Sequence, residues 1–163
     1  MIHQVTGDIL LTKAQVIAHG VAPNDDFHSG LALALREQWP ALYKDFRHFH
    51  HQEHPDAGTL WMWGTTGGLR IVSLFTQNSA THAGGHAGKA SIENVNHALR
   101  ALHKLAEKEK FTSIALPRLA TGVGGLEWSA VEPLIEHHLG SLSIPIIIYS
   151  TYAAGKQAAE PLT

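Results

Sequence analysis

The segment Leu116–Trp128, LPRLATGVGGLEW, contains three glycines within four positions: Gly122, Gly124 and Gly125. Glycine costs conformational entropy inside helices and strands, so such a cluster indicates a sharp turn or a backbone that approaches a ligand closely. The apolar run at 111–116 predicts a strand, and the pattern at 128–139 predicts a helix. The glycines therefore lie in a strand-to-helix connection.

A second strand-to-helix connection occurs earlier in the chain. Residues 15–19 (QVIAH) predict a buried strand, residues 31–38 (LALALREQ) predict a helix, and the loop 20–30 between them is rich in turn residues. The remaining expected elements are an edge strand at 1–5, a helix from Pro40 to Glu53, a hairpin of strands at 58–64 and 69–76, an amphipathic helix at 89–110, and a buried strand at 144–149. This alternation predicts an α/β fold, with a mixed and mostly parallel sheet between helices on both faces.

Both connections are suited to binding phosphate. Ligands of open α/β sheets bind beyond the carboxyl ends of the strands, and backbone N–H groups near a helix N-terminus favour an anion. Two such loops predict an elongated ligand with a diphosphate between them, although tight turns without a ligand would give the same spacing. The chain has no Walker loop and no dinucleotide-binding fingerprint, which disfavours nucleoside triphosphate hydrolysis and hydride transfer.

The composition indicates one domain. The 163 residues are 44% apolar, enough for one core, and we expect a domain at 1–152 followed by a flexible tail at 153–163. A net charge of −2 disfavours electrostatic binding of long nucleic acid. The absence of cysteine excludes disulfides and thiolate zinc sites. No apolar run is long enough to span a membrane. We therefore expect a cytoplasmic monomer with no cofactor and no membrane partner.

Three motifs, in chain order, resemble those of the macro domain family, which binds ADP-ribose. Val5–Ile9 (VTGDI) resembles the family's opening motif, IAH at 17–19 through GLA at 30–32 resembles its first phosphate loop, and Leu116–Trp128 resembles its second loop and following tryptophan. The resemblance extends over roughly Met1 to Tyr149. It is strongest to the branch that holds the terminal ADP-ribose glycohydrolases, the DNA ADP-ribosyl glycohydrolase antitoxins and the ADP-ribose-1″-phosphate phosphatases.

The resemblance implies a ligand contact for each motif. Asp8 would accept a hydrogen bond from the adenine amino group and the Ile9 backbone would support the ring, although Asp8 is explained equally well as a cap or turn residue. The two glycine-containing loops would hold the diphosphate and the distal ribose. The implied ligand-binding residues are Asp8, Ile9, Asn24, Ser29, Gly30, Leu31, Thr121, Gly122, Val123, Gly124 and Gly125.

Two positions depart from the catalytic pattern of this branch. Its glycohydrolases carry a lysine that attacks the distal ribose, where this chain has Gln77. A glutamine amide has no basic lone pair and cannot form a Schiff base, so covalent catalysis of the lysine type is excluded. The terminal glycohydrolases also carry an aspartate in the second loop, where this chain has Gly124.

Three other residues are therefore the catalytic candidates: His19, His28 and Asp25. A histidine of ordinary pKa suits general acid–base catalysis at neutral pH, and an aspartate can activate water. The segment 79–89 is a candidate flap that would bring His82, His86 or Lys89 over the ligand. For each histidine, the alternative is a surface or hydrogen-bonded side chain without a catalytic role.

The histidine-rich segment at 48–54 is a weaker candidate for a site. His50 and His54 would lie one helical turn apart, a spacing that can hold zinc or nickel. We expect a solvated helix face there instead, and no metal site.

The sequence thus predicts a protein that binds ADP-ribose and hydrolyses a derivative of it at the 1″ position of the distal ribose. The substrate would be ADP-ribose-1″-phosphate or an ADP-ribosylated macromolecule. Two alternatives stay open: a reader that binds ADP-ribose without turnover, and an antitoxin that acts on ADP-ribosylated DNA.

Overall fold

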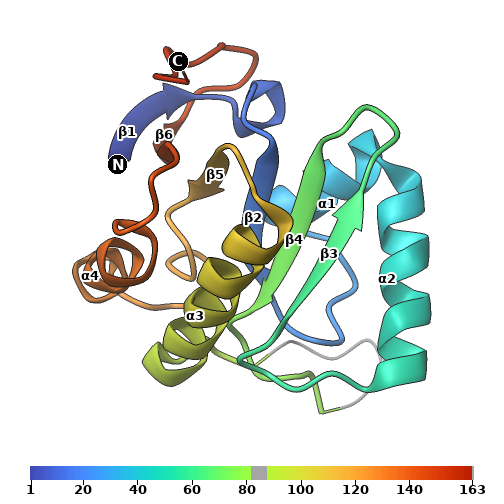
Figure 1. The fold of residues 1–163 in the computed structure, drawn as a ribbon. Coiled ribbons are helices and arrows are strands. Elements are labelled where there is room, and N and C mark those ends of the chain that lie inside the picture. Colours follow the sequence, from blue (N-terminus) through green and yellow to red (C-terminus); the bar gives the residue numbers. More distant parts are fainter. Residues whose placement is uncertain (82–87, 163) are drawn as a thin grey trace.

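A six-stranded sheet forms the centre of the structure, a computed structural model that describes residues 1–81 and 88–162. The strands are β1 (Ile2–Gly7), β2 (Val16–Val21), β3 (Leu60–Gly64), β4 (Arg70–Phe75), β5 (Ile114–Pro117) and β6 (Ile146–Tyr152). The helices are α1 (Gly30–Gln38), α2 (Pro40–Glu53), α3 (Ile92–Glu109) and α4 (Trp128–Leu139), with a short 3-10 turn, η1 (Ile9–Leu11). The strand order is β1-β6-β5-β2-β4-β3, and all neighbours are parallel except β3 and β4 (Figure 1).

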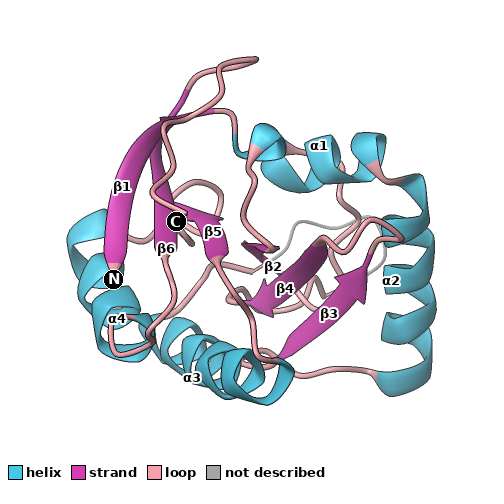
Figure 2. Cartoon of the chain, turned by 45° about the horizontal axis from the view of Figure 1, so that its top comes forward, coloured by secondary structure: helices cyan, strands magenta, loops and turns pink. Residues whose placement is uncertain are grey.

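Helices cover both faces of the sheet. Helices α3 and α4 pack on one face, and α1 and α2 on the other (Figure 2). Strand β2 belongs to both cores, because Val16 and Ala18 face α3 and α4 while Ile17 faces the opposite layer. Burial on both faces explains why β2 begins with three apolar residues in succession, Val16–Ala18. The three-layer α/β fold expected from the sequence is confirmed.

Two strand boundaries differ from those expected. The first strand continues through Thr6 and Gly7, because an irregularity after Val5 keeps β1 paired with β6. The strand expected from Phe111 begins only at Ile114. Phe111 instead ends α3: its amide donates to the carbonyl of Ala106, after a left-handed Lys110.

The segment 153–162, expected to be a flexible tail, returns along η1 and β1. The amide of Asp8 donates to the carbonyl of Lys156 over 2.8 Å. Glu160 accepts hydrogen bonds from the Tyr149 hydroxyl over 2.6 Å and from the Lys13 amide over 2.8 Å. The domain boundary at residue 152 remains a prediction.

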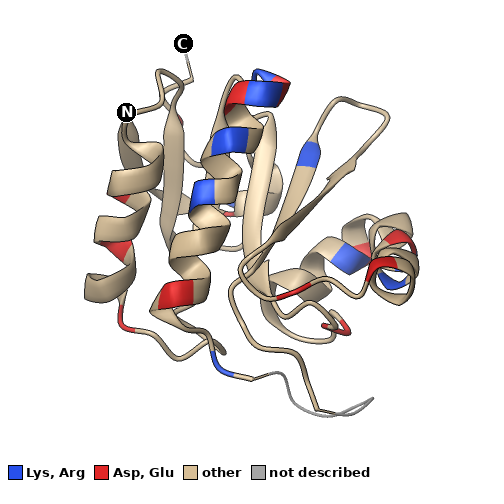
Figure 3. Ribbon diagram, turned by 60° about the horizontal axis from the view of Figure 1, so that its bottom comes forward, with Lys and Arg blue, Asp and Glu red and all other residues tan. Residues whose placement is uncertain are grey.

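Charged side chains are unevenly distributed over the helices. Helix α4 carries acidic residues, whereas α3 carries a row of lysine and arginine with acids at its ends (Figure 3).

Among the described residues, no helix has the length and apolar character needed to cross a bilayer.

Candidate functional site

The candidate site lies where β2 and β5 end side by side. These parallel neighbours lead to helices on opposite faces of the sheet, β2 to α1 and β5 to α4. Such a divergence opens a crevice at the carboxyl ends of the strands. A cavity of about 260 Å³, here called the cleft, occupies this position. Its lining residues are His19, Gly20, Val21, Asp25, Ser29, Gly30, Leu31, Ala32, Gln77, Pro117, Arg118, Leu119, Ala120, Gly122, Val123 and Gly124.

The two connections expected to hold phosphate both line this cleft. They are the β2–α1 loop (residues 22–29) and the β5–α4 loop (residues 118–127). Among residues 1–81 and 88–162, nothing accepts a hydrogen bond from the amides of Gly30–Ala32 or Gly122–Gly124. The Ser29 side chain makes no cap hydrogen bond to α1. Because α1 directs the positive end of its dipole at the same place, the cleft is suited to an anion with several acceptor oxygens.

Gly124 is held in a tight backbone fold. A Cβ atom at this position would lie 2.6 Å from the carbonyl oxygen of Ala120 and 2.9 Å from Cβ of Ala90. The same Ala120 carbonyl accepts from the amide of Leu126 over 3.0 Å, which closes the turn. An aspartate of the kind expected in the terminal glycohydrolases therefore has no room at residue 124.

Phe27 anchors the β2–α1 loop. Its side chain is fully buried although its φ is 55°, a left-handed conformation that bulky residues rarely adopt. Its ring centroid lies 4.8 Å from that of Phe46 and 5.7 Å from that of His19. The Asp25 carboxylate accepts from the Phe27 amide over 2.8 Å. This anchor brings Asp25 and His19 to the same cleft.

The environments of His19 and Asp25 shift their pKa values in opposite directions. His19 is 2% exposed and its Nε2 is hydrogen-bonded to Oγ of Ser73 over 2.8 Å. Burial lowers the pKa of His19 from 6.5 to about 4, so the ring is neutral at neutral pH and lacks the ordinary pKa assumed from the sequence. Burial raises the pKa of Asp25, which makes this carboxyl a better proton acceptor than an exposed one.

Several residues proposed from the sequence lie outside the cleft lining. His28 is exposed and contacts the carboxylate of Asp26. Asn24 joins the loop to the segment after β4, since its side chain accepts from the Ala80 amide over 2.8 Å and donates to the Ala80 carbonyl over 3.0 Å. The Thr121 hydroxyl donates to the carbonyl of Arg118 over 2.8 Å. Gly125, at φ 78°, supports the turn rather than lining the cleft.

Asp8 acts as a cap, the alternative that the sequence left open. One carboxylate oxygen accepts from the Leu10 amide over 3.0 Å and the other from the Gly155 amide over 2.9 Å. Ile9 is buried behind it. Each carboxylate oxygen keeps a further lone pair, so a contact with adenine remains a prediction.

Two further histidine-containing segments were candidates from the sequence, the flap at 79–89 and the segment at 48–54. His82 and His86 of the candidate flap lie outside the described residues. The ring centroids of His50 and His54 are 6.3 Å apart, and in the described part of the chain no group of three or more potential ligands is placed to hold a metal.

Arg118 is one of the cleft residues that the sequence analysis did not assign to the site. It supplies the one lysine or arginine side chain among the cleft-lining residues of the described chain, and its guanidinium lies 5.4 Å from the centroid of the Trp128 ring. Its place directly after β5 was the available signal, because residues that follow a strand at the carboxyl edge of the sheet face the crevice.

A model of the Macro domain family matches residues 26–135, which include the second half of the β2–α1 loop and the whole β5–α4 loop. The chain belongs to the macro domain family. The recognition made from the sequence motifs is thereby confirmed.

Relatives and solved structures agree with this assignment. The chain is 27% identical to a DNA ADP-ribosyl transferase–DNA ADP-ribosyl glycohydrolase fusion protein of Thermosipho africanus, covering 89% of this macro domain but only 40% of the fusion protein. It is 23% identical to the human ADP-ribose glycohydrolase OARD1, over 90% of this chain and 89% of that protein. The macrodomain of Thermus aquaticus DarG has the same fold, with a TM-score of 0.79 at 22% identity over 92% of this chain and 98% of that one. Thermosipho africanus DarTG in complex with ADP-ribose gives a TM-score of 0.78 at 24% identity, over 96% and 42% of the two chains.

Two glycines of the β5–α4 loop give a matched pair of variants. Gly124→Ala places a methyl group against the Ala120 carbonyl, so we expect the free energy of unfolding to fall by about 1–3 kcal/mol. Gly122→Ala meets no atom within 4 Å and has no positive φ, so its unfolding free energy is expected to change by less than about 1 kcal/mol. Urea unfolding measures both. Equal losses of stability in the two variants would contradict the packing described for Gly124.

Proposed function

We propose that this macro domain binds ADP-ribose and hydrolyses the bond that links C1″ of its distal ribose to a leaving group. The main support is a pair of amide clusters that line one cleft, Gly30–Ala32 and Gly122–Gly124, and that lack protein acceptors within the described chain. A diphosphate presents acceptor oxygens in two directions and matches two such clusters. The distal ribose then extends toward His19, Asp25 and Gln77, and adenine toward Asp8.

In this proposal the nucleophile is water, and Asp25 is its general base. Gln77 cannot form a Schiff base, and its amide nitrogen donates to the carbonyl of Gly88 over 3.1 Å. Asp25 takes a proton from water as the water oxygen bonds to C1″. The bond from C1″ to the leaving group breaks, and that group departs with the electron pair and is protonated from solvent. Neutral His19, oriented by Ser73, positions the reactants by hydrogen bonding.

Two relatives support hydrolysis as the reaction, since their names describe a DNA ADP-ribosyl glycohydrolase and an ADP-ribose glycohydrolase. The leaving group is open among phosphate, a carboxylate side chain and a modified base. The replacement of the branch's lysine by Gln77 favours a second candidate, a reader that binds ADP-ribose without turnover. We also infer a cytoplasmic monomer.

The proposal is tested by calorimetry with ADP-ribose, followed by turnover assays on ADP-ribose-1″-phosphate, an ADP-ribosylated glutamate peptide and thymine-modified DNA. We expect binding in the micromolar range and hydrolysis of at least one substrate. Failure to bind millimolar ADP-ribose would overturn the function altogether. Binding without turnover of any substrate would establish the reader.

Asp25→Asn tests the assigned base. Its amide keeps an acceptor oxygen for the Phe27 amide but cannot take a proton, so kcat should fall by about 10²–10⁴ while the Kd for ADP-ribose stays within about threefold. The wild-type kcat/KM should fall as pH drops through the raised pKa of Asp25, and should show no step near 6.5, because His19 is already neutral there. His28→Ala, a change on the exposed side of the same loop, is the control. A loss of turnover in this control as large as in Asp25→Asn would contradict the assignment.

A further inference from the structure

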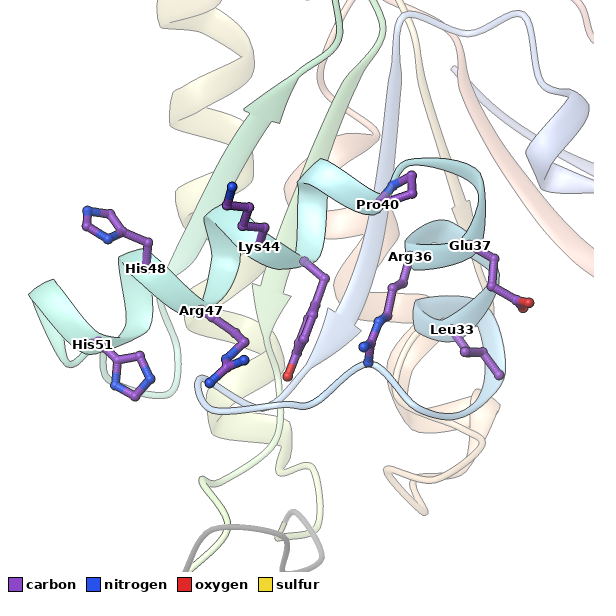
Figure 4. Close-up of a pocket in the computed structure, with 9 residues that line it drawn as sticks. Leu33, Arg36, Glu37, Pro40, Lys44, Arg47, His48 and His51 are labelled. Carbon is purple, nitrogen blue, oxygen red and sulfur yellow. The ribbon is translucent and has the colours of Figure 1, made fainter.

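A second and larger concavity lies between α1 and α2, on the outer side of the molecule. This α1–α2 groove has a volume of about 690 Å³ and is open to solvent (Figure 4). Its lining includes Arg36, Lys44 and Arg47 against one acid, Glu37. Three cations and one anion leave the groove at +2, whereas the whole chain carries −2. The groove is thus a local site of positive charge on an acidic protein.

Arg36, Arg47 and Tyr43 give the groove flat surfaces as well as charge. The guanidinium of Arg36 lies 4.1 Å from the centroid of the Tyr43 ring, and that of Arg47 lies 5.9 Å from it. Arginine binds phosphate oxygens through a planar fork of donors, and both arginine and tyrosine stack on bases. This combination fits a phosphodiester strand better than an acidic peptide, which offers carboxylates but no stacking rings.

The groove and the cleft share the β2–α1 loop. Nη1 of Arg36 donates to the carbonyl of Asp26 in that loop over 3.0 Å, and Figure 4 shows Arg36 and Arg47 reaching toward the chain segment that passes below α2. The Tyr43 ring centroid lies 5.5 Å from that of Phe27, which in turn contacts His19 of the cleft. The loop that supplies Asp25 therefore contacts residues of both the groove and the cleft.

We propose that the α1–α2 groove binds the phosphate backbone of a single-stranded nucleic acid. A strand held there passes the β2–α1 loop and brings one of its nucleotides to the cleft. Together with the proposed function, on which this last step rests, the groove favours a nucleic acid among the ADP-ribosylated substrates left open above. Binding of the strand itself requires no ADP-ribose.

The test is fluorescence anisotropy with a labelled, unmodified oligothymidylate of about 12 nucleotides at about 50 mM salt. We expect saturable, salt-sensitive binding that excess ADP-ribose does not displace. The double variant Lys44→Ala/Arg47→Ala should weaken binding at least about tenfold and reduce the slope of log Kd against log salt by about 1.4, or 0.7 for each lost phosphate contact. The matched control is Lys104→Ala/Lys108→Ala, which removes two exposed cations from α3. It should bind as the wild type does.

Three results would overturn the groove as a nucleic-acid site: no saturable binding, an equal loss in the α3 control, or equally tight binding of a polyglutamate peptide of the same charge. Calorimetry with ADP-ribose on the same variants separates the two proposals. A protein that binds ADP-ribose but not the oligonucleotide retains the proposed function and loses the groove. A protein that binds only the oligonucleotide retains the groove and loses the proposed function.

Discussion

The burial of the Phe27 side chain fixes the β2–α1 loop, which lines the cleft. Its left-handed backbone conformation costs about 1–3 kcal/mol, which the surrounding packing must offset. The ring contacts Phe46 in α2, Tyr43 at the α1–α2 groove and His19 in β2. One side chain thus fixes the β2–α1 loop against a helix and a strand at once. Asp25 is held by the same residue, because its carboxylate accepts a hydrogen bond from the Phe27 amide.

The cleft is built mainly from backbone groups. Its anion-binding capacity comes from unpaired amides and the N-terminus of α1, with Arg118 as the cationic side chain among its described lining residues. Backbone donors need glycine or other small residues close by, which accounts for the glycines that follow β5. Backbone donors also allow a chain with a net charge of −2 to bind phosphate, because a nest of amides requires no excess of lysine and arginine. The same packing excludes an acidic side chain at Gly124.

The sequence predicts the helices and strands of this fold well because each has a clear pattern of apolar residues. Local sequence alone indicates the structure of three elements: β2 from its apolar residues, α3 from its apolar stripe, and α4 from the pattern at 128–139. The loop geometry is set by tertiary contacts instead. Nothing near Phe27 in the sequence indicates a buried phenylalanine at positive φ. The sequence therefore could not distinguish between two of its candidates, Asp25, which lines the cleft, and His28, which does not. The lowered pKa of His19 likewise could not be predicted, because it comes from burial in the folded protein. The hydrogen-bond partner of His19, Ser73, is also distant in the chain.

The proposed function requires two strand-to-helix connections to hold one diphosphate between their amides. Titration of ¹⁵N-labelled protein with ADP-ribose, followed by amide chemical shifts, tests it most directly. We expect the largest shifts at Gly30–Ala32 and Gly122–Gly124 together, with the amides of α3 and α4 little changed. Shifts at only one of the two clusters, or larger shifts on α3 and α4, would contradict it.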